Sequence, residues 1–289
     1  MAVSRDVMMG GFDKQPFLKT LSLFDWVWAA LVIGGAAFIF YRYGAVMDIY
    51  ETIILAGVTP AIIAFGWNWK PARIYLLTVA VLSLLAVNIY GDNLAAAETN
   101  FFLKFLISSQ SAIMWMSALF VMATVAYFAG LFLRSDFTTR VATAMTWSAA
   151  AMGLVGLFVR WRESYLIHVD VGHIPVSNLY EVFVLFSVIT ALLYLYYEAR
   201  YKTRSLGAFV LLVITAAVGF VLWYTFGREA HAIQPLVPAL KSYWMKIHVP
   251  ANFIGYGSFS LAAMVGVAYL LRNRAERRNP QGLLATRLP

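Results

Sequence analysis

Residues 240–261 read LKSYWMKIHVPANFIGYGSFSL, a polar stretch that passes directly into an apolar one. The apolar part continues to residue 271, and residues 249–271 contain no charged side chain. A helix needs about 20 predominantly apolar residues to cross the hydrocarbon core of a bilayer. The stretch therefore predicts a membrane-spanning helix whose first turns lie at a water–lipid boundary.

The composition of the whole chain gives the same indication. Of its 289 residues, 62% are hydrophobic and 12% are charged, and the mean hydropathy is +0.74. Soluble domains contain roughly 45–50% apolar residues, so the composition excludes a soluble protein and indicates a polytopic one surrounded by membrane lipid. The net charge of +8 is explained by basic inner loops rather than by nucleic-acid binding. The lack of cysteine excludes disulfides, cysteine-ligated metals and thiol redox chemistry by these residues.

Seven further apolar stretches precede residues 249–271 in the chain, so we expect an all-α transmembrane helical bundle of about eight spans. No apolar region follows the first charges of residues 1–16, so we expect no cleavable signal peptide there. The expected spans cover residues 24–40, 52–67, 74–90, 111–133, 141–159, 179–197, 206–226 and 249–271.

The distribution of lysine and arginine predicts the orientation. With the N-terminus inside, the inner segments hold 15 of these residues and the outer segments hold 7. Because short inner loops are enriched in basic residues, both ends are expected in the cytoplasm. Three long outer loops then span residues 91–110, 160–178 and 227–248, and they contain all four histidines of the chain.

The approach to the last span holds the first candidate site. Lys241, Trp244 and His248 are spaced as i, i+3 and i+7, which places them on one face if the stretch is helical. An imidazole, an indole and a cation at a membrane surface suit a flat, anionic, iron-bearing ligand, which is heme. The alternative is a histidine that rests in the headgroup zone with its polar tip in water.

The loop RWRESYLIHVDVGHIPVSNLYE offers a second set of candidates. Arg160 and Arg162 flank an indole and are candidates for holding heme propionates, or they anchor the end of the fifth span at the interface. His168, Asp170 and His173 are alternative metal ligands, although their spacing matches no known signature. Glu181 lies inside the sixth span, where a carboxylate needs a partner, and a structural ion pair with Arg160 or Arg162 is the first interpretation.

Two segments together resemble a known family. GHIPVSNLYE at 172–181 and SYWMKIHVPANFIGYGSFSLA at 242–262 are similar, in order and spacing, to the CcsA/ResC-type heme-handling proteins of system II cytochrome c biogenesis, called CcsB in some bacteria. The resemblance covers residues 160–271 well and the first five spans loosely.

The resemblance implies that heme b is carried to the outer face of the cytoplasmic membrane. There it is joined to the CxxCH motif of apocytochrome c with a ResB-type partner, in a holocytochrome c synthase complex. His248 matches one of two external histidines of the family, and would be an axial ligand of heme iron covered by Trp244. Lys241, Arg160 and Arg162 would meet the propionates, and His173 and Glu181 match a segment that is structural or close to heme. The chain then divides into N-terminal spans, a heme-handling region and a basic cytoplasmic tail, in residues 1–159, 160–271 and 272–289.

One departure from the family pattern concerns its tryptophan-rich WWD segment. No W-G-x-x-W-x-W-D occurs in the sequence, so we expect the chain to be a fragment or the rest to lie on another chain.

Two other functions are weighed against heme delivery. A cytochrome b type of electron carrier needs histidine pairs within its spans, and none occur here. A secondary transporter, for heme or another small molecule, is favoured by broken helices and charges at the membrane midplane. Pro60 is a weak indication of the first feature, and the second is lacking.

Overall fold

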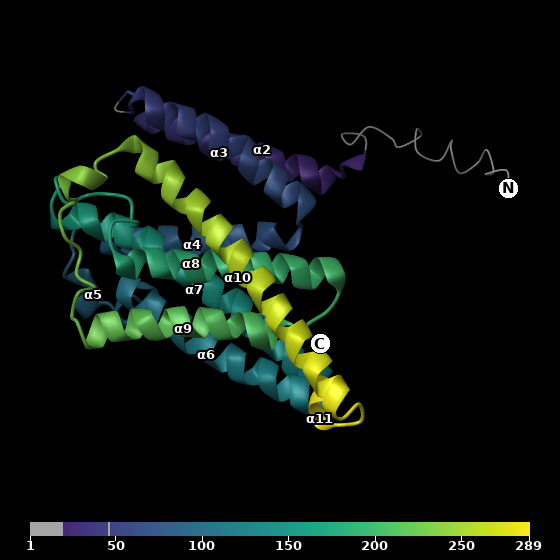
Figure 1. Ribbon diagram of the computed structural model, residues 1–289. Helices are drawn as coiled ribbons and strands as arrows, with labels where there is room; N and C mark the ends of the chain where they lie inside the picture. The colour runs from purple at the N-terminus through teal and green to yellow at the C-terminus, as the bar shows by residue number, and fades with distance from the viewer. Residues whose placement is uncertain (1–19, 46) are drawn as a thin grey trace. The chain divides into compact units, whose positions relative to one another are not determined.

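The computed structural model describes residues 20–45 and 47–289, and within these ranges every regular element is a helix. Eight helices are long and apolar enough to cross a membrane, which confirms the predicted all-α fold with eight spans. The expectation about a signal peptide, and the basic residues at positions 5, 14 and 19, lie outside the described residues. Figure 1 shows the arrangement.

The long helices agree with the predicted spans but extend beyond several of them. At the fifth span the helix continues past residue 159, through residues that were predicted to form a loop. The long helices are α2 (Leu23–Tyr43), α3 (Ile49–Asn68), α4 (Pro71–Tyr90), α6 (Ser109–Leu133), α7 (Asp136–Ile167), α8 (Leu179–Tyr201), α9 (Gly207–Phe226) and α10 (Tyr243–Arg278). The short elements are α5 (Ala96–Thr99), the π-helix η2 (Leu103–Ile107), the 3₁₀-helix η3 (Pro238–Leu240) and α11 (Leu283–Arg287).

The chain forms two compact units, the first ending at Ile74 and the second beginning at Tyr75. In the first unit, α3 continues as a helix through Pro60, so the broken helix that would favour a transporter is not seen there. An ion pair between Asp25 and Arg73 closes this unit, and the Trp67 indole donates a hydrogen bond to the Asp25 carbonyl oxygen at 2.9 Å. Since isolated charges are costly at membrane depth, pairing satisfies both groups.

The second unit is a helical bundle in which α6 packs most extensively on α7 and also on α9, while α8 contacts α7, α9 and α10. Small residues on α7 make this close approach possible. A Cβ atom at Gly153 would lie 2.6 Å from Met116 of α6 and 2.6 Å from Val188 of α8. In lipid, where apolar burial does not drive helices together, such close backbone packing is a main source of association. Helix α10 crosses α8 and α9 obliquely (Figure 1) and leaves most of its surface exposed.

The second unit has two ends that differ in chemistry. At one end α7 and α9 finish and α8 and α10 begin, and the sequence motifs lie there; we call it the motif end. At the other, α6 and α8 finish and α7 and α9 begin, and lysine and arginine predominate; we call it the basic end. The connections between the helices of this bundle lie at its two ends, and functional side chains are found preferentially on such connections.

Candidate functional site

A buried ion pair lies at the centre of the motif end. Arg160 Nε donates to Glu181 Oε1 at 2.7 Å, and both side chains are almost completely buried, with only 1% of Glu181 exposed. A second nitrogen of the same guanidinium donates to the carbonyl oxygen of His231 at 2.5 Å. The pair therefore connects α7, the start of α8 and the loop after α9. Of the two arginines considered as partners for Glu181, Arg160 is the one that the structure selects.

The segment SNLYE is a helix start in which each polar residue has a defined contact. Asn178 is the N-cap of α8 and accepts a hydrogen bond from the Glu181 amide at 3.0 Å. Glu181 Oε2 in turn accepts two hydrogen bonds from Ser177, from its amide and its hydroxyl, both at 2.8 Å. The Arg160 guanidinium lies over the Tyr180 ring, 5.1 Å from the ring centroid. Because an N-cap satisfies amides that have no helical partner, these residues fix where α8 begins.

His173 belongs to the same network. Its ring is buried, with Nδ1 at 2.6 Å from the Val171 carbonyl oxygen and Nε2 at 2.8 Å from the Ser177 hydroxyl. Both ring nitrogens are thus engaged within the protein, which suits a residue that positions Ser177 and Glu181 more than one that ligates a metal.

His168 and Asp170 lie apart from that buried ring, on the exposed turn after α7, with 3.5 Å between His168 Nδ1 and the Asp170 carboxylate. Across the described residues, no group of three or more histidine, aspartate and glutamate side chains gathers as a metal site. The alternative of a metal held by His168, Asp170 and His173 is therefore wrong.

Arg162 points away from Arg160, which contradicts the expectation of an arginine pair on a loop. Both residues lie in the last turns of α7, where positions two apart face different directions. Arg162 donates to the Gly91 carbonyl oxygen at 2.6 Å and pairs with the exposed Asp92 carboxylate at 2.9 Å. The two guanidinium groups therefore cannot clamp one ligand between them.

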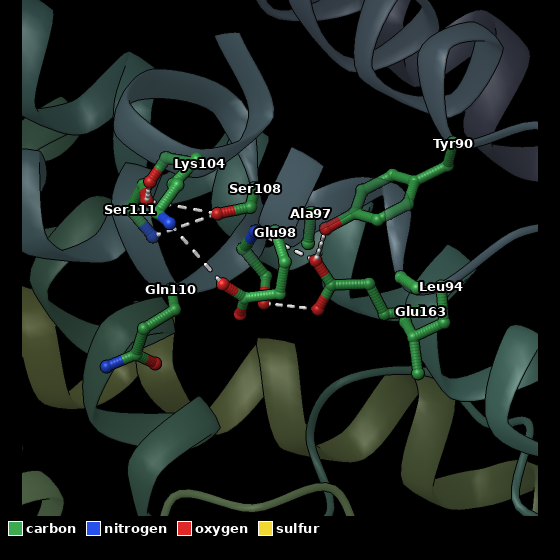
Figure 2. Close-up of a pocket in the computed structure, with 11 residues that line it drawn as sticks. Tyr90, Leu94, Ala97, Glu98, Lys104, Ser108, Gln110, Ser111 and Glu163 are labelled. Atoms are coloured by element: carbon green, nitrogen blue, oxygen red, sulfur yellow. Dashed lines mark hydrogen bonds and ion pairs between the residues drawn. The ribbon is translucent and has the colours of Figure 1, made fainter. Parts of the chain in front are cut away.

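Next to this network is a cavity of about 780 Å³ between the end of α4, the segment 94–111 and α7 (Figure 2). At its wall the carboxylate of Glu163 accepts hydrogen bonds from the Tyr90 hydroxyl at 2.6 Å, from the Ser109 amide at 3.0 Å and from the Ser109 hydroxyl. Lys104 and Glu98, which also line the cavity, form an exposed ion pair at 3.7 Å, drawn as a dashed line in Figure 2. Gln110 connects the cavity to the surroundings of the buried Arg160–Glu181 pair. Its side-chain oxygen accepts a hydrogen bond at 3.1 Å from the hydroxyl of Tyr180, the residue that lies against Arg160.

Glu163 is a residue that the sequence reasoning missed. It follows Arg160 by three positions and, like Glu181, it is a carboxylate within the bundle that needs a partner. The signal was hidden because residues 160–178 were expected to form a loop, where a carboxylate is free in water. Since α7 continues to Ile167, Glu163 lies on a buried helical face instead.

The stretch around His248 is exposed rather than buried. Helix α10 begins at Tyr243 with Ser242 as its N-cap, so Lys241 precedes the helix and does not share its face. Trp244 and His248 are one turn apart on α10, and 75% of the Trp244 surface is exposed. His248 Nε2 lies 2.8 Å from the side-chain amide nitrogen of Asn252, another turn further along.

A smaller cavity of about 370 Å³ lies between the start of α8 and the segment that leads into α10. Ser177 and Asn178 line it from the start of α8, and Leu240 lines it from the segment that leads into α10. Tyr224 of α9 and residues between 229 and 237 form the remaining wall. The cavity therefore lies between the ion-pair network and the approach to His248.

Comparison with known proteins gives a consistent result. Residues 176–287 match the family of the cytochrome C assembly protein. Three relatives are each named cytochrome c biogenesis protein CcsA. The Chlorella vulgaris protein is 35% identical over 41% of this chain and 35% of its own length. The Cyanophora paradoxa protein is 34% identical over 39% of this chain and 33% of its own length. The Gloeobacter violaceus protein is 31% identical over 54% of this chain and 44% of its own length. No solved structure matches the chain.

The resemblance to CcsA-type proteins is thereby confirmed over this region. The chain spans about a third to under half of the length of these relatives. The matched residues 176–287 begin just before the N-cap of α8 and include the whole of α9 and α10. In this CcsA-like region, Ser177, Asn178 and Glu181 form the buried network, whereas Trp244 and His248 form the exposed surface.

Proposed function

We propose that this chain acts in cytochrome c biogenesis by presenting heme at the outer face of the cytoplasmic membrane for attachment to apocytochrome c. The observation that carries the proposal is an accessible imidazole and indole, His248 and Trp244, one turn apart inside the CcsA-like region. Heme is the cargo, and it supplies the vinyl groups that react with the two thiols of a CxxCH motif.

His248 is the proposed axial ligand. His248 is hydrogen-bonded to Asn252 at an exposed position, and exposed hydrogen bonds add about 1 kcal/mol or less to stability. Iron coordination can replace such a bond without disturbing the fold. Trp244 would shield one side of the porphyrin from water, because its indole is free to lie against a flat ligand.

The other candidates divide by their contacts. Lys241 is exposed beside the start of α10 and suits a propionate carboxylate. The Arg160 guanidinium is buried and already paired, and Arg162 is held by Gly91 and Asp92, so neither offers a free fork to a propionate. We assign Arg160, His173 and Glu181 to positioning the loop next to the heme surface, and a ResB-type partner to completing it.

The test replaces His248 by alanine in the native protein and measures the heme absorption of the purified protein and the yield of cytochrome c. Both are expected to fall strongly while the unfolding temperature is unchanged, since the side chain is exposed. His168→Ala is the matched control, because it removes another exposed imidazole from the motif end. Normal heme content and yield in His248→Ala would refute the ligand role.

A further inference from the structure

The basic end of the second unit holds a cavity of about 350 Å³ that the proposed function does not use. Four cationic side chains line it: Arg134 from the turn between α6 and α7, Lys202 and Arg204 from the turn between α8 and α9, and Arg287 from α11. These three parts of the chain are far apart in sequence. Their convergence on one cavity is therefore a property of the folded unit.

Two of the cations occupy backbone positions that favour glycine. Arg134 and Lys202 are the C-caps of α6 and α8, and both have a left-handed conformation with φ of 53°. A residue other than glycine is strained in that region, because its Cβ atom approaches the backbone too closely. The attraction between a basic side chain and the negative end of the helix dipole offsets part of this strain. Both strained positions face the same cavity, which indicates that their charge has a use there.

The positive charge at the cavity exceeds the negative charge. Arg204 is paired with Glu198 at 3.2 Å, and Asp136 contributes a carboxylate to the lining. Arg134 donates to a neutral acceptor, the Thr286 carbonyl oxygen, at 3.1 Å. Arg287 Nη1 is buried and has no hydrogen-bond partner among the described residues. Buried donors are nearly always satisfied, so this nitrogen points to a missing acceptor.

We propose that this cavity binds the phosphate group of an anionic ligand. A phosphate offers several oxygen acceptors at once, which matches converging guanidinium groups and the hydroxyls of Thr203 and Ser205 in the same lining. The cavity lies where four spans end, at the level of lipid headgroups, and basic pockets between membrane helices are suited to anionic lipids. An anionic phospholipid is therefore the expected source, and a soluble phosphate is the other source with the same chemistry.

The test compares two double variants that each remove two positive charges from the chain. Lys202→Gln with Arg287→Gln changes the cavity. Arg274→Gln with Arg278→Gln is the matched control, because both residues are exposed near the end of α10 and do not line the cavity. Each protein is purified in a neutral detergent, titrated with phosphatidylglycerol or phosphatidylcholine and followed by native mass spectrometry. Inorganic phosphate is tested separately by its effect on the unfolding temperature.

The parent and the control are expected to bind phosphatidylglycerol at least about tenfold more tightly than phosphatidylcholine, and the cavity variant is expected to lose this preference. A rise in unfolding temperature with inorganic phosphate alone, lost in the cavity variant, would assign the site to a soluble phosphate. If both double variants lose binding equally, or if neither probe distinguishes them from the parent, the proposal is overturned. Should the double variant unfold, Lys202→Gln alone answers the same question, because this side chain is exposed.

Discussion

At the scale of single residues, Glu181 shows how one buried carboxylate organises a loop. Its two oxygens are used by different partners, one by Arg160 and the other by Ser177. Removing either charge from such a pair leaves the other charge buried without compensation, which costs about 3–5 kcal/mol. The position of the loop before α8 therefore depends on this one side chain.

We predict that Glu181→Ala lowers the stability of the purified protein by about 3 kcal/mol, seen as a lower unfolding temperature in detergent. Arg162→Ala is the matched control, because it breaks an exposed pair with Asp92 and should cost less than about 1 kcal/mol. The loss of stability in the double variant, Glu181→Ala with Arg160→Met, should be smaller than the sum of the losses in the two single variants. Equal losses for Glu181→Ala and Arg162→Ala would contradict this assignment of the buried pair.

At the scale of helices, α7 is the element around which the second unit packs. It contacts α6 and α8, and Tyr75 of α4 donates a hydrogen bond to the Ala150 carbonyl oxygen of α7 at 3.1 Å. Its last two turns also carry Arg160 and Glu163, so one helix determines both the core and the polar network. A change in the packing of α7 should therefore be transmitted to the motif end.

We predict that Gly153→Val destabilises the protein by about 2 kcal/mol, because the new side chain would overlap Met116 and Val188. Gly219→Val in α9 is the control, since a Cβ atom at that position meets nothing within 4 Å. The comparison uses unfolding temperatures in the same detergent. A Gly153→Val protein as stable as the Gly219→Val protein would show that α7 does not pack as closely as described.

At the scale of the whole molecule, eight spans and the surplus of basic residues on alternate segments determine the expected orientation. Under that orientation the motif end faces outward and the basic end faces the cytoplasm. The heme-presenting surface and the anion cavity would then lie on opposite sides of the membrane. The proposed heme site requires this arrangement, so the orientation has a test of its own.

Because the sequence has no cysteine, an introduced cysteine is its only thiol. We predict that Asp170→Cys, at the motif end, reacts with a membrane-impermeant maleimide in intact spheroplasts. Arg278→Cys, which follows three further spans, should react only after the membrane is opened. Both positions are exposed, so accessibility within the protein does not limit labelling. The reverse pattern of labelling would invert the topology and remove the basis for an outward heme site.

The number of spans, the start of the sixth span at residue 179 and the resemblance over residues 160–271 followed from the sequence by itself. These features depend on residues that are neighbours in the chain, such as an apolar run long enough to cross lipid. The choice of partners required the tertiary structure. Glu163 binds Tyr90 and Ser109, which are 73 and 54 residues away, and four cations from three distant segments share one cavity. Which groups meet depends on where each helix ends and on the direction in which its faces turn, and neither is visible in the local pattern.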